Sequence, residues 1–253
     1  MKYFFRVIYS DLYKVLHTRL LWIHLFVPLL GIVLAGGYLL QSSWEETEKI
    51  MAYVQLVSIA FPFMITVVVT MLFEAEAAAG KFQNVLLVPC SKMLSHTGNL
   101  FSLFMFGMFA GVFAMSGFGV AAKVTGLRSM SLFFYGITGV YLFITNIAVY
   151  FLQYMICFIW GKSISMGVGI TGTLLSAMLM YGMGDSIWKW CPYSYGIRCI
   201  SYFLYRILKP ELYVYMAKEN RTGIFDVGIV TAGLFALFLV WSLRWQGTRE
   251  KEE

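Results

Sequence analysis

The chain has 253 residues, of which 60% are hydrophobic and 13% are charged, and its formal net charge is +6 at pH 7. Soluble domains contain about 25% charged residues, so this composition excludes an ordinary soluble globular protein and indicates a membrane protein. The apolar runs are continuous and do not alternate with polar residues, which argues against a transmembrane β-barrel.

Residues 1–19 precede the first long apolar run and have a helical hydrophobic period. One face carries Phe5, Ile8, Leu12 and Leu16, and basic or polar residues lie opposite. We expect an amphipathic helix on the membrane surface, with its basic face toward anionic headgroups. A cleaved signal peptide is the alternative. The charged region is too long for one, and the apolar run that follows is long enough to span the bilayer.

Six apolar segments are long enough to cross a membrane, since a helix needs about 20 residues to span the hydrocarbon core. Each should be helical, because backbone groups in lipid must be paired within their own segment. The segments are residues 20–40, 54–73, 100–122, 132–160, 164–183 and 225–245. The predicted fold is an all-α polytopic membrane protein with one membrane domain over residues 1–253. The connections leave no room for a soluble catalytic domain.

Basic residues at the ends of the apolar segments predict the orientation. Lys14 and Arg19 precede the first segment, Lys162 lies between the fourth and fifth, and Arg249 follows the last. Six crossings place all of these on one side, which the positive-inside rule assigns to the cytoplasm. The connection at residues 41–53 is acidic, which agrees with an outer location. Both termini are therefore predicted to be cytoplasmic. The same rule explains the positive charge, so no nucleic-acid partner is predicted.

Residues 74–99 form a polar loop between the second and third apolar segments. Its distinctive residues are Glu74, Glu76, Ala79, Gly80, Gln83, Asn84, Leu86, Pro89 and Lys92. Their spacing resembles the cytoplasmic loop of type-2 ABC transporter permeases. The acid followed by Ala-Gly, Asn, Leu, Pro and Lys is most similar to the permease subunits of lantibiotic (bacteriocin) self-immunity exporters. An ordinary loop with an amphipathic turn is the alternative interpretation.

The resemblance implies that this loop contains a coupling helix that docks on a separate ATPase. Glu74 and Glu76 would stabilise the start of that helix, where the dipole favours negative charge. Gly80 would permit close approach to the ATPase or a tight bend, and Pro89 would end the helix. The Glu74-Ala-Glu-Ala-Ala-Ala stretch has fewer charges than is common in the family, which affects how the loop pairs with its ATPase.

The resemblance also implies a set of partners and a location. A partner ABC ATPase, in two copies, would hold ATP and Mg, so this chain would bind no cofactor and would not be an enzyme. A second, similar permease subunit would complete the pathway as a heterodimer, with a homodimer as the alternative. The implied cargo is a cationic antimicrobial peptide, expelled from the producer's membrane. The location would be a bacterial cell membrane, with membrane lipid in contact.

The third, fourth and fifth apolar segments contain a few small and polar residues. Gly107 and Gly111 form a GxxxG pair of the kind that lets helices approach closely. Asn146 and Gln153 are seven residues apart and so share a helix face, where they serve helix packing or substrate contact. The glycines at residues 167–172 spell a dinucleotide fingerprint, but no strand precedes them. We find no acidic or basic residue deep in a segment, which argues against an ion-driven carrier.

Residues 184–223 form a long outer segment rich in aromatic and basic residues. Prolines at positions 192 and 210 divide it into two expected helices, residues 193–208 and 211–220. We expect a re-entrant helical hairpin beside the export path, with its arginines extending outward. An interfacial aromatic belt without a substrate role is the alternative. The candidate substrate-path residues are Asn146, Gln153, Trp188, Trp190, Tyr195, Arg198, Tyr202 and Arg206.

Other functions fit the sequence less well. An intramembrane enzyme needs paired acids and histidines within its spans, and only His24 lies in one of the six apolar segments. A secondary carrier would show inverted repeats, and we see none. The four cysteines have no metal-ligand spacing, so we predict free thiols and no metal site. A general drug, lipid or ion exporter of the ABC class remains an alternative, because nothing in the apolar pathway identifies the cargo.

Overall fold

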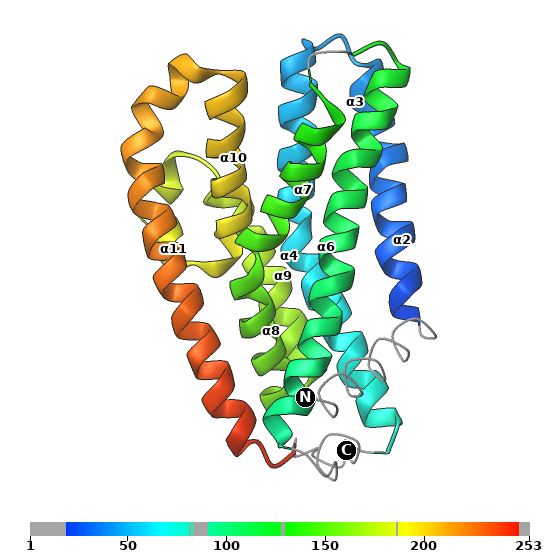
Figure 1. Ribbon diagram of the computed structural model, residues 1–253, viewed down its shortest axis with the longest axis vertical. Coiled ribbons are helices and arrows are strands. Elements are labelled where there is room, and N and C mark those ends of the chain that lie inside the picture. The colour runs from blue at the N-terminus through cyan, green and yellow to red at the C-terminus, as the bar shows by residue number, and fades with distance from the viewer. Residues whose placement is uncertain (1–18, 81, 83–90, 128–129, 186, 248–253) are drawn as a thin grey trace.

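The computed structural model describes residues 19–80, 82, 91–127, 130–185 and 187–247. Every regular element within these residues is a helix, which confirms the all-α class (Figure 1). The predicted surface helix at residues 1–19 lies outside the described residues, apart from Arg19 at the start of α2.

The first apolar segment forms three consecutive helical pieces. Helix α2 (Arg19–Gly31) runs into a π-helical turn, η1 (Ile32–Gly36), and then into α3 (Gly37–Gln41). Pro28 lies inside α2 and lacks the N–H that the helical ladder needs. Ser42 adopts an extended conformation that ends α3.

The next two helices are much longer than the predicted apolar segments. Helix α4 (Glu46–Ala78) and helix α6 (Lys92–Val124) each have 33 residues. Acidic side chains in the first turn of α4 suit the positive end of its dipole. Ser91 caps α6 by accepting a hydrogen bond from the backbone N–H of Leu94.

The fourth predicted span is broken into two helices. Helix α7 (Leu132–Thr145) and helix α8 (Ile147–Trp160) meet at Asn146 with a bend of 42°. The Asn146 amide donates a hydrogen bond to the carbonyl of Leu142 at 2.8 Å, four residues back. A side chain that bonds its own backbone competes with the helical ladder, which explains a break at this residue.

The remaining chain differs from the prediction in two places. Helix α9 (Lys162–Met178) ends five residues before the predicted end of the fifth segment. Three short 3-10 turns follow: η2 (Gly182–Gly184), η3 (Trp188–Trp190) and η4 (Pro192–Ser194).

Helix α10 (Tyr195–Leu208) then leads through Lys209 into helix α11 (Pro210–Arg244). The predicted division between a helix at 211–220 and a span at 225–245 is wrong, because α11 is continuous. Gly223 does not break it: a Cβ there would lie 2.1 Å from the Trp188 ring, so this glycine provides space for that ring.

Four single helical segments are long and apolar enough to span a membrane: Leu20–Gln41, Glu46–Ala78, Lys92–Val124 and Pro210–Arg244. The bent pair α7 and α8 makes a fifth if it is one span. Helix α9 has only 17 residues. The described part of the chain is therefore a helical bundle with four to five candidate membrane spans.

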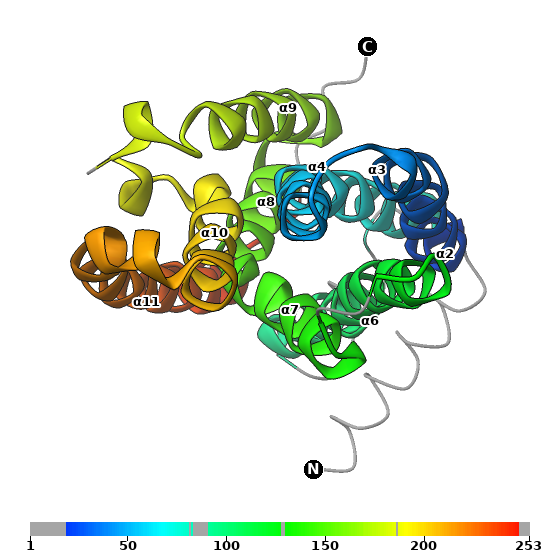
Figure 2. The same ribbon diagram turned by 90° about the horizontal axis from the view of Figure 1, so that it is seen from above.

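The connections alternate between the two ends of the bundle (Figure 1). The C-terminal end of α4, the corner between α8 and α9, and the last turn of α11 lie at one end. The C-terminal ends of α3, α6 and α10 lie at the other. Viewed from above, α4 is near the centre and contacts α2, α6, α8, α9 and α10 (Figure 2).

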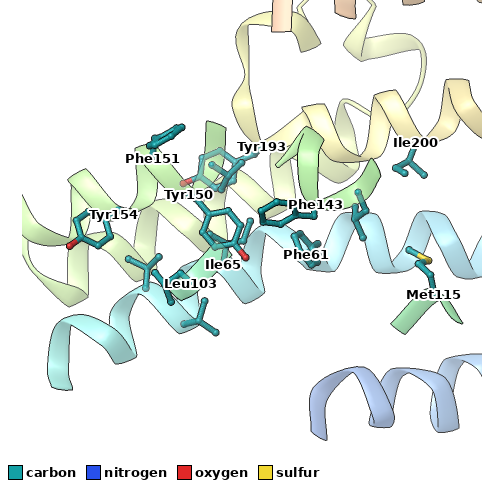
Figure 3. Close-up of a cluster of buried hydrophobic side chains, with 14 of the residues drawn as sticks. Phe61, Ile65, Leu103, Met115, Phe143, Tyr150, Phe151, Tyr154, Tyr193 and Ile200 are labelled. Atoms are coloured by element: carbon teal, nitrogen blue, oxygen red, sulfur yellow. The ribbon is translucent and has the colours of Figure 1, made fainter. Parts of the chain in front are cut away.

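Aromatic side chains fill much of the buried core. Phe61, Phe143 and Tyr150 are each at most 8% exposed and come from α4, α7 and α8 (Figure 3). Helices α6 and α7 approach closely: a Cβ on Gly139 would lie 2.6 Å from the Cα of Val112, so only glycine fits there. This is the close packing that small residues permit in membrane helices.

Candidate functional site

The loop that carries the permease-like pattern leaves the end of α4. Glu74 and Glu76 lie in the last turns of that helix, which begins 28 residues before Glu74 and ends at Ala78. The prediction that they stabilise the start of a helix is therefore wrong. The apolar run and the acids continue one helix, because alanines on both sides of Glu76 favour its extension. Glu74 is exposed and Glu76 is buried.

The chain turns sharply after α4. Gly80 has a φ of 115°, a conformation that residues with a Cβ rarely adopt. Phe82 has a φ of 65°, and its backbone N–H bonds the carbonyl of Glu76 at 3.3 Å. A positive φ is unusual for a bulky residue and persists only where surrounding contacts fix it. Of the two predicted roles of Gly80, the structure shows the bend.

The contacts that fix Phe82 are aromatic. Its ring is 5% exposed and lies 5.1 Å from Phe73, 5.9 Å from Phe158 and 5.7 Å from Trp245, measured between centroids. These rings continue into a larger group, which we name the loop-end cluster. Its members are Phe73, Phe82, His96, Tyr154, Phe158, Trp241 and Trp245. The cluster unites the ends of α4, α6, α8 and α11 with the start of the loop.

Hydrogen bonds strengthen the same junction. The Trp245 indole N–H donates to the carbonyl of Phe158 at 3.1 Å, and Lys92 Nζ donates to the carbonyl of Trp245 at 3.1 Å. His96 is fully buried, and its Nδ1 lies 3.0 Å from the hydroxyl of Tyr154. The end of α11 is thus held to both α6 and α8.

A surface ion pair adds α9 to this end of the bundle. Lys162 Nζ lies 2.7 Å from Glu74 Oε1, and the two side chains are 59% and 52% exposed. The hydrogen bond that Lys162 donates to Glu74 raises the pKa of Lys162. An exposed pair contributes little stability. The pair nevertheless shows that the end of α4 and the start of α9 are in contact.

The structure describes five of the nine loop residues named above: Glu74, Glu76, Ala79, Gly80 and Lys92. Gln83, Asn84, Leu86 and Pro89 lie outside the described residues, as does Cys90. Sequence reasoning missed Phe82, whose signal was that residues 74–99 contain no other phenylalanine, tyrosine or tryptophan.

Within the outer segment, residues 184–223, polar contacts join the short turns after α9 to α11. Trp188 is fully buried, and its indole N–H donates to Glu219 at 2.9 Å. Lys189 pairs with Asp226 at 3.1 Å. These contacts attach the short turns after α9 to the first half of α11.

Arg198 is the centre of the other set of contacts in the outer segment. It is 4% exposed, donates to the carbonyl of Leu179 at 2.5 Å, and pairs with Asp185 at 2.9 Å. Its guanidinium also donates to the Tyr202 hydroxyl at 3.3 Å. The prediction that Arg198 extends outward is wrong, because its side chain is buried and bonds groups of its own chain. Arg206 is exposed, as expected.

The predicted aromatic residues divide into a buried group and an exposed one. Trp188, Tyr195 and Tyr202 pack together beside α8, whereas Trp190 is 68% exposed. Burial raises the pKa of both tyrosines, so both hydroxyls stay protonated. The Tyr195 hydroxyl donates to the carbonyl of Lys189 at 2.8 Å.

Asn146 and Gln153 are both fully buried. The Gln153 amide donates to the carbonyl of Ser165 at 2.6 Å and accepts from the Tyr193 hydroxyl at 2.6 Å. It joins α8, α9 and η4, which favours the packing interpretation over substrate contact. Asn146 lies against Gly196 of α10, where a Cβ would be 2.4 Å from its amide nitrogen.

The residues that the structure describes contain no group of three potential metal ligands. Cys157, Cys191 and Cys199 are free thiols, as predicted. No family model, curated protein or solved structure matches the chain. The functional interpretation therefore depends on the loop pattern and on the contacts at the two ends of the bundle.

Proposed function

We propose that the chain is the permease subunit of an ABC exporter, driven by a separate ATPase that binds the loop after α4. The loop pattern from Glu76 to Lys92 supports this assignment. The long apolar helices support a membrane location. The observation that carries the proposal is the way the start of this loop is inserted into the bundle.

A loop that receives force must be attached firmly to the helices it moves. Phe82, two residues beyond the bend at Gly80, is buried among rings from α4, α8 and α11. Close-packed interiors have low compressibility and transmit strain. A displacement of the loop would therefore reach several helices together, and the Glu74–Lys162 pair would extend it to α9.

Six crossings are part of the proposal. Helix α9 has 17 residues, which is about 26 Å at 1.5 Å per residue and close to the roughly 30 Å of the hydrocarbon core. Counting α9, and α7 with α8 as one bent span, gives six. Helix α10 and the first half of α11 would form the re-entrant outer hairpin. Both termini would then be cytoplasmic.

The proposed assembly contains two ATPase copies, which bind ATP and Mg, and a second permease. A different, similar permease is the first choice and a second copy of this chain is the alternative. The proposed cargo is a cationic antimicrobial peptide, expelled from the membrane of a bacterial producer. A general drug, lipid or ion exporter is the alternative function. The chain itself is proposed to catalyse no reaction and to bind no cofactor.

Co-purification tests the coupling role. The full chain, tagged and extracted from its native membrane, should retain an ABC ATPase. We expect Phe82→Ala to keep that ATPase bound and to abolish export, because the docking residues remain while their attachment to the bundle is lost. Phe101→Ala is the matched control, since Phe101 is 40% exposed on α6, away from the loop. Failure to recover an ATPase, or full export by Phe82→Ala, would refute the proposal.

Drug sensitivity tests the cargo. Cells lacking the protein should become sensitive to one lanthionine-bridged peptide and remain unchanged toward unrelated detergents. Equal sensitivity to both would favour the general exporter. Labelling provides the orientation test: Cys90 should react only with reagents that reach the cytoplasm.

A further inference from the structure

A long apolar groove lies between α2, α4 and α6. Its cavity volume is about 200 Å³. Two of its lining side chains, Val27 and Leu56, are 37% and 49% exposed, so the groove opens to the surface of the bundle. None of its lining residues belongs to the loop-end cluster or to the outer segment.

Short side chains create the groove. They come from all three helices: Gly31, Ala35, Ala60, Gly107, Ala110 and Ala114. Two irregularities lie along its α2 wall, namely Pro28 and the π-helical turn at Ile32–Gly36. Turns of this kind are rare and occur frequently at functional sites. Helix α2 packs chiefly on α6, so the space between α2 and α4 is left unfilled.

The shape of the groove matches an extended hydrocarbon chain. Its lining runs along α2 and η1 from Ile23 to Ala35 and along α4 from Tyr53 to Val68. At 1.5 Å per residue these stretches are about 18 Å and about 22 Å long. They cover more than half of a hydrocarbon core roughly 30 Å thick. The groove is therefore parallel to helices that cross the membrane, which is the direction in which lipid tails extend.

The chemistry of the lining excludes polar occupants. His24 and Tyr53 line the groove, but His24 Nδ1 bonds the carbonyl of Leu20 at 2.7 Å and Tyr53 donates to the carbonyl of Ala114 at 3.1 Å. The Tyr150 hydroxyl is packed against Gly107. A water needs two to four polar partners to occupy a cavity, and apolar cavities instead take apolar ligands.

We propose that this groove binds an acyl chain of a membrane phospholipid. The acyl chain fills the space between α2 and α4 and so joins α2 to the rest of the bundle. Neighbouring phospholipids supply it directly, because the opening faces the hydrocarbon region. The inference does not depend on the transport proposal. It requires only that α2, α4 and α6 cross a bilayer.

Photolabelling tests the site with the full chain in phosphatidylcholine vesicles. A small fraction of the lipid carries a diazirine in the middle of one acyl chain, and adducts are located by mass spectrometry. Leu56 and Met64 in the groove should be labelled at least fivefold more than Leu174 and Met178, which are exposed on α9. Equal labelling of the two pairs would overturn the proposal, because it would show only general lipid contact.

Filling the groove provides the second arm of the test. Ala60→Phe, at the exposed edge of the α4 wall, should lower labelling of Leu56 and Met64 at least fivefold. Ala35→Leu fills it from α2 and should do the same if Ala60→Phe fails to fold. Ala177→Phe, on the exposed face of α9, is the matched control and should leave groove labelling unchanged. Undiminished labelling in a folded, filled variant would refute the site.

Discussion

The two ends of the bundle are held together by different physical means. At the loop end, the contacts are mostly between rings, with Phe82, Phe158 and Trp245 packed edge to face or tilted. In the outer segment, ion pairs act together with a buried aromatic group; the pairs are Arg198–Asp185 and Lys189–Asp226. Each end gathers segments far apart in the sequence.

The difference bears on how each end responds to force. Apolar burial is non-directional, so packed rings can shift together with little loss. Hydrogen bonds weaken steeply when their angle departs from linearity, so a network such as that of Arg198 fixes one geometry. We therefore expect the loop end to move as a unit and the outer segment to keep its shape. Substitutions at the two ends should separate these behaviours.

The largest effect is expected from Arg198→Met in the outer segment. The variant removes the hydrogen bonds that Arg198 donates to the carbonyl of Leu179 and to the hydroxyl of Tyr202. Leaving the buried carbonyl without its charged donor costs about 1–3 kcal/mol, and the lost bond to Tyr202 adds to it. Thermal unfolding in detergent should show a clear fall in Tm. Arg206→Met is the matched control and should change the free energy of unfolding by less than about 0.5 kcal/mol. Equal shifts in the two variants would contradict the buried role of Arg198.

A smaller effect is expected from Tyr193→Phe, which keeps the ring and removes the hydroxyl. The carbonyl oxygen of the Gln153 amide loses its donor inside the bundle. We expect a loss of about 1–2 kcal/mol, measured by unfolding in mixed micelles. Tyr215→Phe, at a side chain 86% exposed, is the control. If Gln153 contacts substrate and has no packing role, Tyr193→Phe should leave stability unchanged and alter export alone.

The loop end should lose less stability than the outer segment when one hydrogen bond is removed. Trp245→Phe removes the N–H that bonds the carbonyl of Phe158 while an aromatic ring remains in the cluster. We expect a cost of about 1 kcal/mol and retained export. Trp190→Phe is the control, because Trp190 is 68% exposed. A loss from Trp245→Phe as large as that from Arg198→Met would show that both ends depend equally on directional contacts.

The sequence predicted the all-helical class because long continuous apolar runs must be helical in lipid, whereas only four to five of the six expected spans are long and apolar enough in the described residues. It failed for Glu74 and Glu76, since an apolar run ending in acids does not show whether the helix stops there or continues. It failed for Arg198 because the partners that bury it, Asp185 and the carbonyl of Leu179, come from a turn whose path depends on tertiary packing. Phe82 was missed for the same reason: two of its neighbouring rings, Phe158 and Trp245, lie far away in the sequence.

The smallest effect is expected from Lys162→Met, which removes the surface pair with Glu74. Both side chains are more than half exposed, so solvent screens the pair and Tm should not change measurably. The pKa of Lys162 is raised by this hydrogen bond from its ordinary value of 10.5. Any contribution of this pair to the free energy of unfolding is therefore fully present below pH 10.5, and it is lost as the pH rises through the higher pKa of Lys162 in the folded protein. A drop in Tm larger than that of Trp245→Phe would mean that the contact of α9 with α4 stabilises the loop end more than its rings do.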